Sequence, residues 1–219
     1  MMDPIVLNGD ESPEAKWLTA WLAGPRRTRW PILPPQVGDQ APDVQLPDAS
    51  GRVRRLSEWW SAGPVHLIFL RHFGCMCLSE RWVRLRDELA ALAGAGAETV
   101  AIAQGESQRT AEVAIRRGYP FPILCDPDRS AYEAFGLLEG APAQILHDFP
   151  WRPGDRETAD GLIRSRSGTE RALVDDPWQL PGEFIIARGG RIGLAHRYQY
   201  CEDFPPNDVL EGAIAAARV

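Results

Sequence analysis

Residues 65–80 read Val-His-Leu-Ile-Phe-Leu-Arg-His-Phe-Gly-Cys-Met-Cys-Leu-Ser-Glu, an apolar run that passes through a glycine into two closely spaced cysteines. The nearly continuous apolar run over 65–71 is typical of a central strand that is buried on both faces. Apolar residues then recur at helical spacing over 78–93, and two glycines follow. The stretch therefore predicts a buried strand that turns directly into a helix, with Cys75 and Cys77 at the turn.

Strands and helices alternate along the chain after this turn. The pattern predicts a strand over 98–103, a helix over 107–117, a strand over 121–125 and a helix over 129–135. Such units imply right-handed crossovers and a largely parallel sheet core. A β-hairpin over 183–200 and a helix from about 207 to 218 are predicted to follow. We expect an α/β fold with a mixed central sheet flanked by helices.

The first 35 residues are expected to form an extension outside the main domain. The pattern predicts an amphipathic helix over 11–23 and an extended connector over 25–35, where prolines forbid a helix. One helix stripe must dock elsewhere; it carries Trp17, Leu18, Trp21 and Leu22, and Ser12 is the candidate cap. The domain over 36–219 is expected to begin with a hairpin around the turn of residues 48–51.

A segment over 138–180 is rich in Pro, Gly, Arg and Asp and shows no clear periodicity. A loop of this length within a compact domain is uncommon, and such loops often act as lids or binding loops. We therefore predict an insertion that precedes the C-terminal hairpin.

Composition and charge limit the classes of partner and the compartment. The 219 residues are 44% hydrophobic, and the net charge of -6 offers no broad basic surface for nucleic acid or anionic lipid. The start lacks the pattern of a secretory leader and no stretch has the length of a membrane span, so we expect a cytoplasmic protein with no nucleic-acid or membrane partner. Four cysteines are too few for a disulfide scaffold, which favours redox or metal chemistry for closely spaced ones.

The predicted position of Cys75 and Cys77 favours thiol chemistry. A thiol at a helix N-terminus meets unpaired backbone N–H groups and the positive end of the helix dipole, and both favour the thiolate. Arg71, and His72 when protonated, would add to this effect. Thiolates attack peroxides and disulfides. The alternative is that both cysteines are small buried hydrophobes.

The remaining cysteines and histidines give weaker signals. The sequence does not place His72, His196, Cys125 and Cys201 in a ligand-spaced cluster, so no metal site is predicted. Cys125 is expected to be buried at the end of a strand. Cys201 could resolve an oxidised Cys75, although a surface thiol with no partner is the default. His66 and His147 carry no motif.

Several blocks of the sequence resemble one protein family. They are Val37-Gly-Asp-Gln-Ala-Pro-Asp43, Gly51-Arg-Val-Arg-Arg-Leu-Ser57, Phe69-Leu-Arg-His-Phe-Gly-Cys75, Phe121-Pro-Ile-Leu-Cys-Asp-Pro-Asp-Arg129 and Phe184-Ile-Ile-Ala-Arg-Gly-Gly-Arg191. Over about residues 36–215 the chain resembles the peroxiredoxin-like branch of the alkyl hydroperoxide reductase/thiol-specific antioxidant (AhpC/TSA) family, in the thioredoxin-like superfamily. The resemblance implies a thioredoxin-like fold, a peroxidatic or redox cysteine at Cys75, turnover with thiol reductants and no organic cofactor.

The chain departs from the pattern of that family at the site itself. Peroxiredoxins have a proline and a threonine ahead of the peroxidatic cysteine, where this chain has Ile68 and His72, and an arginine where it has Pro181. Pro181 matches the cis-proline that faces the active thiol in thioredoxin-like reductases, and X-Pro bonds alone adopt the cis form at low cost. Two roles are open for Cys77. Either it resolves Cys75, or it is itself the better nucleophile, because Cys77-Leu-Ser-Glu80 matches the Cys-x-x-Glu of peroxiredoxins.

The sequence thus favours an antioxidant thiol oxidoreductase in which Cys75 attacks, Cys77 resolves, Arg71 and His72 give electrostatic support, and Pro181 shapes the substrate side. The substrate would be a peroxide or a disulfide, and the reductant thioredoxin, glutaredoxin or a low-molecular-weight thiol. Exposed tryptophans would suit the homodimer that is usual among similar proteins. Three alternatives remain open: a thiol–disulfide oxidoreductase without peroxidase activity, an enzyme specialised for an organic endoperoxide, and a non-catalytic module that binds through the 138–180 segment and the Trp17/Trp21 helix.

Overall fold

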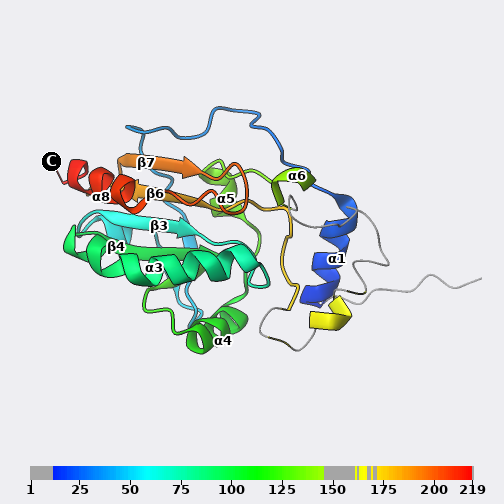
Figure 1. The fold of residues 1–219 in the computed structure, drawn as a ribbon. Coiled ribbons are helices and arrows are strands. Elements are labelled where there is room, and N and C mark those ends of the chain that lie inside the picture. The colour runs from blue at the N-terminus through cyan, green and yellow to red at the C-terminus, as the bar shows by residue number, and fades with distance from the viewer. Residues whose placement is uncertain (1–11, 146–160, 162, 167–168, 170–171, 219) are drawn as a thin grey trace, which may run out of the picture.

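A five-stranded mixed sheet lies at the centre of the computed structural model, which describes residues 12–145, 161, 163–166, 169 and 172–218 (Figure 1). The strand order is β5-β4-β3-β6-β7; the strands are β3 (Val65–Phe69), β4 (Glu98–Ala103), β5 (Ile123–Cys125), β6 (Gly182–Ile186) and β7 (Ile192–Arg197). β4 pairs in parallel with both β3 and β5. β6 pairs antiparallel with β3 on one side and with β7 on the other. The predicted mixed sheet is confirmed.

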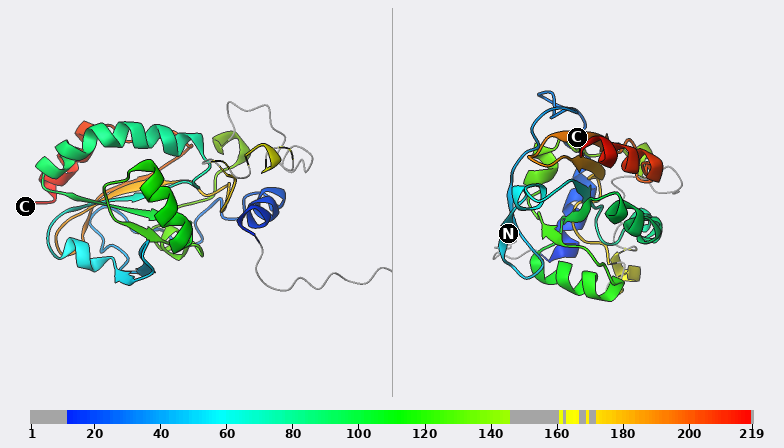
Figure 2. Two further views of the ribbon diagram at one scale, coloured as in Figure 1. Left: turned by 90° about the horizontal axis from the view of Figure 1, so that it is seen from below. Right: turned by 90° about the vertical axis from the view of Figure 1, so that its left-hand side faces the viewer.

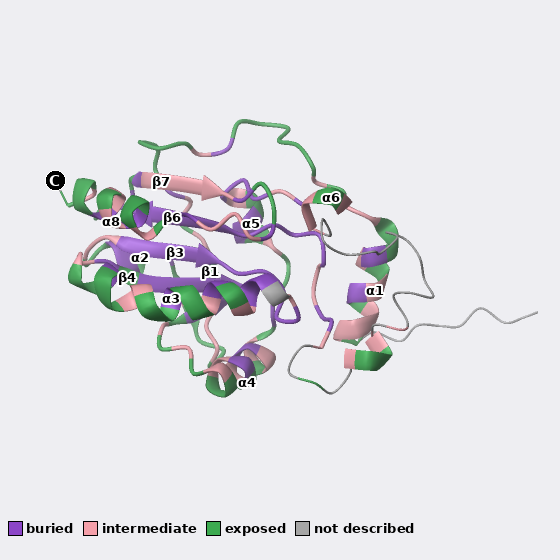
Figure 3. Cartoon of the chain, in the orientation of Figure 1, coloured by how far each residue is buried: buried purple, intermediate pink, exposed green. Residues whose placement is uncertain are grey.

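Helices and a hairpin cover the two faces of this sheet (Figure 2). One face carries α3 (Met76–Gly94), α4 (Ser107–Arg117) and α8 (Asn207–Ala216), which enclose an apolar core with Leu85, Val113 and Ile214. The other face carries α2 (Ser57–Trp60), α5 (Ser130–Ala134) and the hairpin of β1 (Gln45–Pro47) and β2 (Val53–Arg55). Figure 3 shows the central strands buried and exposed residues along the outward face of α3. This arrangement leaves the carboxyl end of β3 as the place where the two cysteines emerge.

Element boundaries follow local backbone chemistry. The predicted helix over 78–93 begins earlier, at Met76, with Cys75 as its N-cap. Gly94 stays helical, and the chain turns away at Gly96, whose φ of +90° suits a residue without a Cβ. The predicted helix over 129–135 starts one residue later because Arg129 adopts a left-handed conformation with φ +60°.

The N-terminal helix α1 (Pro13–Ala23) docks on the segment that precedes β6. The Ser12 hydroxyl accepts a hydrogen bond from the Ala15 N–H at 3.2 Å, as expected of an N-cap. The Trp21 ring stacks between the rings of Trp17 and Trp178 with centroid distances of 5.1 Å. The predicted stripe is therefore correct for its tryptophans, whereas Leu22 is exposed.

The structure describes only part of the segment over 138–180, namely residues 138–145, 161, 163–166, 169 and 172–180. It contains α6 (Pro142–Ile145) and helical residues at 163–166, whereas His147 lies outside the described residues. Backbone bonds join it to its surroundings, since the Gly140 N–H donates to the Trp178 carbonyl at 2.8 Å. No helix in the described part of the chain has both the length and the apolar character that crossing a bilayer requires.

A buried ion network links strands β3 and β6 to helix α3. The carboxylate of Glu183 on β6 is fully buried and accepts hydrogen bonds from His66 Nε2 at 2.8 Å and from Arg81 Nε at 2.7 Å. The Tyr198 hydroxyl donates to the same carboxylate. Burial alone would raise the pKa of Glu183, but His66 and Arg81 hold that pKa well below its usual range. The charge is therefore kept inside the protein by its partners.

Replacing Glu183 by Gln is expected to destabilise the fold strongly. The variant removes the fully buried carboxylate from the Arg81 guanidinium and leaves only the pair with Glu88 at 2.7 Å. Removal of one partner of a buried ion pair costs about 3–5 kcal/mol, and the remaining pair places the expected cost toward the lower end of that range. Denaturant unfolding of the wild type and Glu183→Gln measures the difference in unfolding free energy. The matched control is Glu80→Gln. This variant removes an exposed ion pair between Glu80 and Arg84 on helix α3 and should cost about 1 kcal/mol or less.

The same network sets a dependence of stability on pH. Because the folded pKa of Glu183 is lowered, its contribution is fully present above the unfolded value of about 4.3 and is lost as the pH falls below it. Wild-type stability should therefore fall more steeply in acid than that of Glu183→Gln. Equal costs for Glu183→Gln and Glu80→Gln, or parallel pH profiles, would contradict this assignment.

Candidate active site at the start of helix α3

The two cysteines predicted to be reactive lie where β3 leads into α3. Cys75 is the N-cap of α3, with extended backbone angles of φ −71° and ψ 137°, and its side chain makes no capping hydrogen bond. Cys77 lies in the first turn of the helix, and the two form a disulfide with a Cα–Cα distance of 5.5 Å. Cys75 is partly exposed, whereas Cys77 is only 3% exposed. A molecule from solvent therefore reaches Cys75 first.

The electrostatic surroundings of this turn are positive. The first N–H groups of α3 have no partner within the helix and present the positive end of its dipole to both sulfurs. The buried guanidinium of Arg71 donates from Nη1 to the carbonyls of Pro177 at 2.7 Å and Gln179 at 2.8 Å. Within the described part of the chain, no carboxylate forms an ion pair with Arg71. Arg71 therefore places a buried positive charge beside the cavity that Cys77 and Cys201 line.

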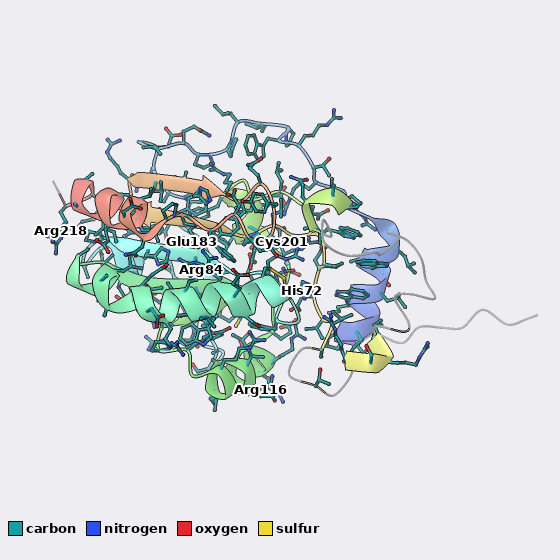
Figure 4. The ribbon with its side chains drawn as sticks, in the orientation of Figure 1. His72, Arg84, Arg116, Glu183, Cys201 and Arg218 are labelled. Atoms are coloured by element: carbon teal, nitrogen blue, oxygen red, sulfur yellow. A yellow bond between two sulfur atoms is a disulfide. The ribbon has the colours of Figure 1, made fainter. Side chains whose placement is uncertain are left out.

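His72 and Glu80 differ in their relation to the thiols. His72 is buried, and its carbonyl accepts a hydrogen bond from the Cys75 N–H at 3.0 Å, which shapes the turn. Figure 4 places the side chain of His72 at the N-terminal end of α3. Glu80, the last residue of the Cys-x-x-Glu match, is exposed and pairs with Arg84 at 2.8 Å. His72 therefore lies at the site, and the carboxylate of Glu80 is committed to an ion pair on the surface.

Pro181 lines a small cavity behind the disulfide, together with Cys77, Cys201 and Arg71. The cavity measures about 10 Å³, which is at most enough for one water molecule. The match to a cis-proline does not extend to the peptide bond, because the bond before Pro181 is trans. The chain enters β6 directly at Gly182, and the Pro181 carbonyl accepts from the Tyr198 N–H at 3.2 Å, so the proline belongs to extended backbone at the strand entrance.

Cys201 is the main correction to the expected site. The default prediction of a surface thiol without a partner is wrong, because Cys201 is 2% exposed and its sulfur lies within 4.8 Å of the sulfurs of Cys75 and Cys77. Burial raises the pKa of the Cys201 thiol, and the charge of Arg71 opposes that shift. Figure 4 shows Cys201 and His72 at the same end of the sheet. The fold thus brings together three sulfurs.

The three sulfurs have the chemistry of a soft-metal site only when all are reduced. Thiolates are ligands that Zn²⁺ and Cu(I) accept. In the disulfide state, however, Cys75 and Cys77 have no thiolate to offer. Cys125 lies outside this cluster; it is fully buried at the end of β5, and burial raises the pKa of its thiol. Its surroundings agree with the structural role expected from the sequence.

The ion network around Glu183 borders this site and was not predicted. Arg81 and Tyr198, which both bind Glu183, line the cavity beside Cys77. The available signal was one ionisable residue within each of two apolar strands, namely His66 in β3 and Glu183 in β6. A charged residue within a buried strand needs a partner, but the sequence does not indicate which one.

Comparison with known proteins finds a matching family and several curated relatives. The model of the AhpC/TSA family matches residues 37–193. Peroxiredoxin-like 2C of Bos taurus is 26% identical over 174 residues, which are 77% of this chain and 76% of the relative. Thiol-disulfide oxidoreductase ResA of Geobacillus thermodenitrificans is 34% identical over 104 residues, which are 46% of this chain and 58% of the relative.

A solved structure shares the fold. The crystal structure of Peroxidoxin BcpB from Mycobacterium tuberculosis superposes with a TM-score of 0.59 at 21% identity and covers 84% of this chain and 99% of that one. The five-stranded mixed sheet, the cysteine at the start of α3 and the match over 37–193 lead to one conclusion. This chain belongs to the AhpC/TSA family and is a peroxiredoxin-like thiol oxidoreductase.

Proposed function

We propose that the protein reduces peroxides through the thiolate of Cys75, with Cys77 as the resolving thiol. One observation carries this assignment: Cys75 is the partly exposed sulfur at the N-terminus of α3, and Cys77 lies behind it at disulfide distance with 3% exposure. A nucleophile must meet its substrate, whereas a resolving thiol needs only to reach the oxidised sulfur. The difference in exposure therefore favours Cys75 over Cys77 as the attacking residue.

The reaction would proceed in two steps. The Cys75 thiolate attacks the distal oxygen of the peroxide, an S–O bond forms as the O–O bond breaks, and the leaving alkoxide takes a proton to become an alcohol. The Cys77 thiolate then attacks the sulfur of the Cys75 sulfenic acid, and the S–O bond breaks as the Cys75–Cys77 disulfide forms. The departing hydroxide takes a proton from solvent and leaves as water. The peroxide gains two electrons, and the two thiols supply them.

The Cys75–Cys77 disulfide must be reduced for turnover. Because Cys75 is the accessible sulfur, we propose that a thiol reductant attacks there and forms a mixed disulfide. Thioredoxin, glutaredoxin or a low-molecular-weight thiol would serve in the cytoplasm, the proposed compartment. The small cavity beside Cys77 has no room for these molecules, which supports approach from the Cys75 side.

A second candidate is thiol–disulfide exchange without peroxidase activity. It is favoured by the residues around the thiols, because His72 stands where peroxiredoxins have a threonine and Pro181 where they have an arginine. The similarity to ResA, which is named a thiol-disulfide oxidoreductase, agrees with this candidate. In both candidates the attacking residue is Cys75, and the two differ in the oxidant that Cys75 meets.

Replacing Cys75 by Ser is expected to abolish rapid reaction with hydrogen peroxide. Stopped-flow mass spectrometry of the reduced protein should detect the Cys75–Cys77 disulfide in the wild type and no rapid oxidation in Cys75→Ser. Because the Cys201 sulfur lies within 4.8 Å of Cys75, a persistent sulfenic acid is expected in the double variant Cys77→Ser/Cys201→Ser. Cys125→Ser is the matched control, because Cys125 is a buried cysteine outside the sulfur cluster and should leave the rate unchanged.

Two outcomes would contradict the peroxidase proposal. A sulfenic acid that survives in Cys75→Ser and is lost in Cys77→Ser would make Cys77 the nucleophile. Wild-type thiols that react with peroxide no faster than free cysteine, but rapidly with an insulin disulfide, would favour the second candidate.

Replacing Arg71 by Met is expected to raise the pKa of the attacking thiol by about one unit or more. The variant removes a buried cation near the sulfurs, and a nearby opposite charge typically lowers a pKa by about 1–3 units. The rate of alkylation by iodoacetamide against pH measures this pKa. Arg71→Lys should retain part of the effect, and Arg84→Met, which removes an exposed arginine of α3, should have none. An unchanged pKa in Arg71→Met would exclude Arg71 from thiolate stabilisation.

A further inference from the structure

We infer that Cys201 is a third redox residue of this site, which exchanges with the Cys75–Cys77 disulfide to form a buried Cys77–Cys201 disulfide and release Cys75. The inference rests on the proposed function, because it concerns the same thiols after their oxidation. It assigns to Cys201 a role beyond the two-cysteine reaction.

The geometry places Cys201 within reach of the disulfide. The three sulfurs all lie within 4.8 Å of one another, so a new S–S bond of about 2.05 Å requires two sulfurs to approach by at most about 2.8 Å. The Cys201 sulfur makes only a weak contact with the Ile145 carbonyl at 3.9 Å, while its N–H donates to the Gln144 carbonyl at 3.2 Å. The main chain of Cys201 is thus held, and its sulfur is held weakly.

Cys77 is the sulfur that Cys201 is placed to attack. Cys77 and Cys201 are 3% and 2% exposed and line the same cavity with Pro181, whereas Cys75 lies outside that cavity and is partly exposed. Attack at Cys77 makes Cys75 the leaving group. Its thiolate departs at the N-terminus of α3, where the unpaired N–H groups stabilise negative charge. A stabilised leaving thiolate accelerates exchange.

The exchange conserves electrons. Cys201 gives its proton to solvent, its thiolate forms a bond with the Cys77 sulfur, and the Cys75–Cys77 bond breaks with its electron pair on Cys75. No external oxidant or reductant takes part. The product holds one disulfide in the interior, and the accessible Cys75 is again a thiol, able to react with a second oxidant or to form a mixed disulfide. The buried Cys77–Cys201 disulfide would thereby remain oxidised, because reductants in solvent do not reach its two sulfurs.

Tryptic mapping of the wild-type protein tests the exchange directly. Cleavage after arginine places Cys75 and Cys77 together in peptide 72–81 and Cys201 in peptide 198–218. The reduced protein is oxidised with one equivalent of diamide, sampled over time into acidic guanidinium with N-ethylmaleimide, and digested. We expect the disulfide within 72–81 to decline as a linked pair of 72–81 with 198–218 appears, with N-ethylmaleimide on Cys75.

Two variants assign the sulfurs. Cys201→Ser should keep only the disulfide within 72–81 and lose all labelling of Cys75 after oxidation. Cys125→Ser, the matched control, should give the linked pair in wild-type yield, because Cys125 lies outside the cluster. Labelling of Cys77 in the linked pair, in place of Cys75, would overturn the assignment of Cys77 as the attacked sulfur.

The test separates this inference from the proposed function. Diamide oxidises thiols without peroxide, so the linked pair forms even if the protein fails to reduce peroxides. A wild-type protein that reacts rapidly with peroxide but shows only the 72–81 disulfide at all times, including after equilibration in a glutathione redox buffer, would overturn the role of Cys201 and leave the proposed function standing.

Discussion

The buried carboxylate of Glu183 is the constraint on which the rest of the structure depends. An ionised carboxylate inside a sheet is tolerated only when partners replace the water it has lost. Its partners come from separate parts of the chain: His66 from β3, Arg81 from α3 and Tyr198 from the residue after β7. Meeting this requirement fixes α3 against the central strands. The same contacts therefore fix the start of α3, where the cysteines lie.

The thiol site combines this fixed helix with a less regular segment. α3 supplies Cys75, Cys77 and the unpaired N–H groups, and the chain at 177–179 supplies the carbonyls that hold Arg71. That segment is itself covered by α1 through the stacked rings of Trp21 and Trp178. The N-terminal extension is thus linked to the position of Arg71 by a short chain of contacts. Of the tryptophans that the structure describes, only Trp30 is exposed, so the expectation of exposed rings for a dimer does not hold for the others.

Much of the fold could be predicted because its signals are local. The apolar run over 65–71, the helical period after Cys77 and the glycine pair at 189–190 each indicate an element through neighbouring residues, and β4 and α4 have the predicted bounds. The structure differs from the sequence-based expectations where contacts between residues far apart in the sequence decide how a side chain is placed. Leu22 shares the predicted stripe with Trp21, yet only the tryptophan meets a partner ring. Pro181 shares a position with a known cis-proline, yet it continues into β6 with a trans bond.

The sequence by itself determined the α/β order, the thiol pair at a strand-to-helix turn and the family, because hydrophobic period, turn residues and motif spacing are properties of adjacent residues. Only the tertiary structure decided which side chains meet. The partners of Glu183, the carbonyls that hold Arg71 and the arrival of Cys201 beside Cys75 and Cys77 each join segments separated by many residues. Such contacts depend on how strands pair and how loops return across the sheet edge, and local residue patterns do not encode that information.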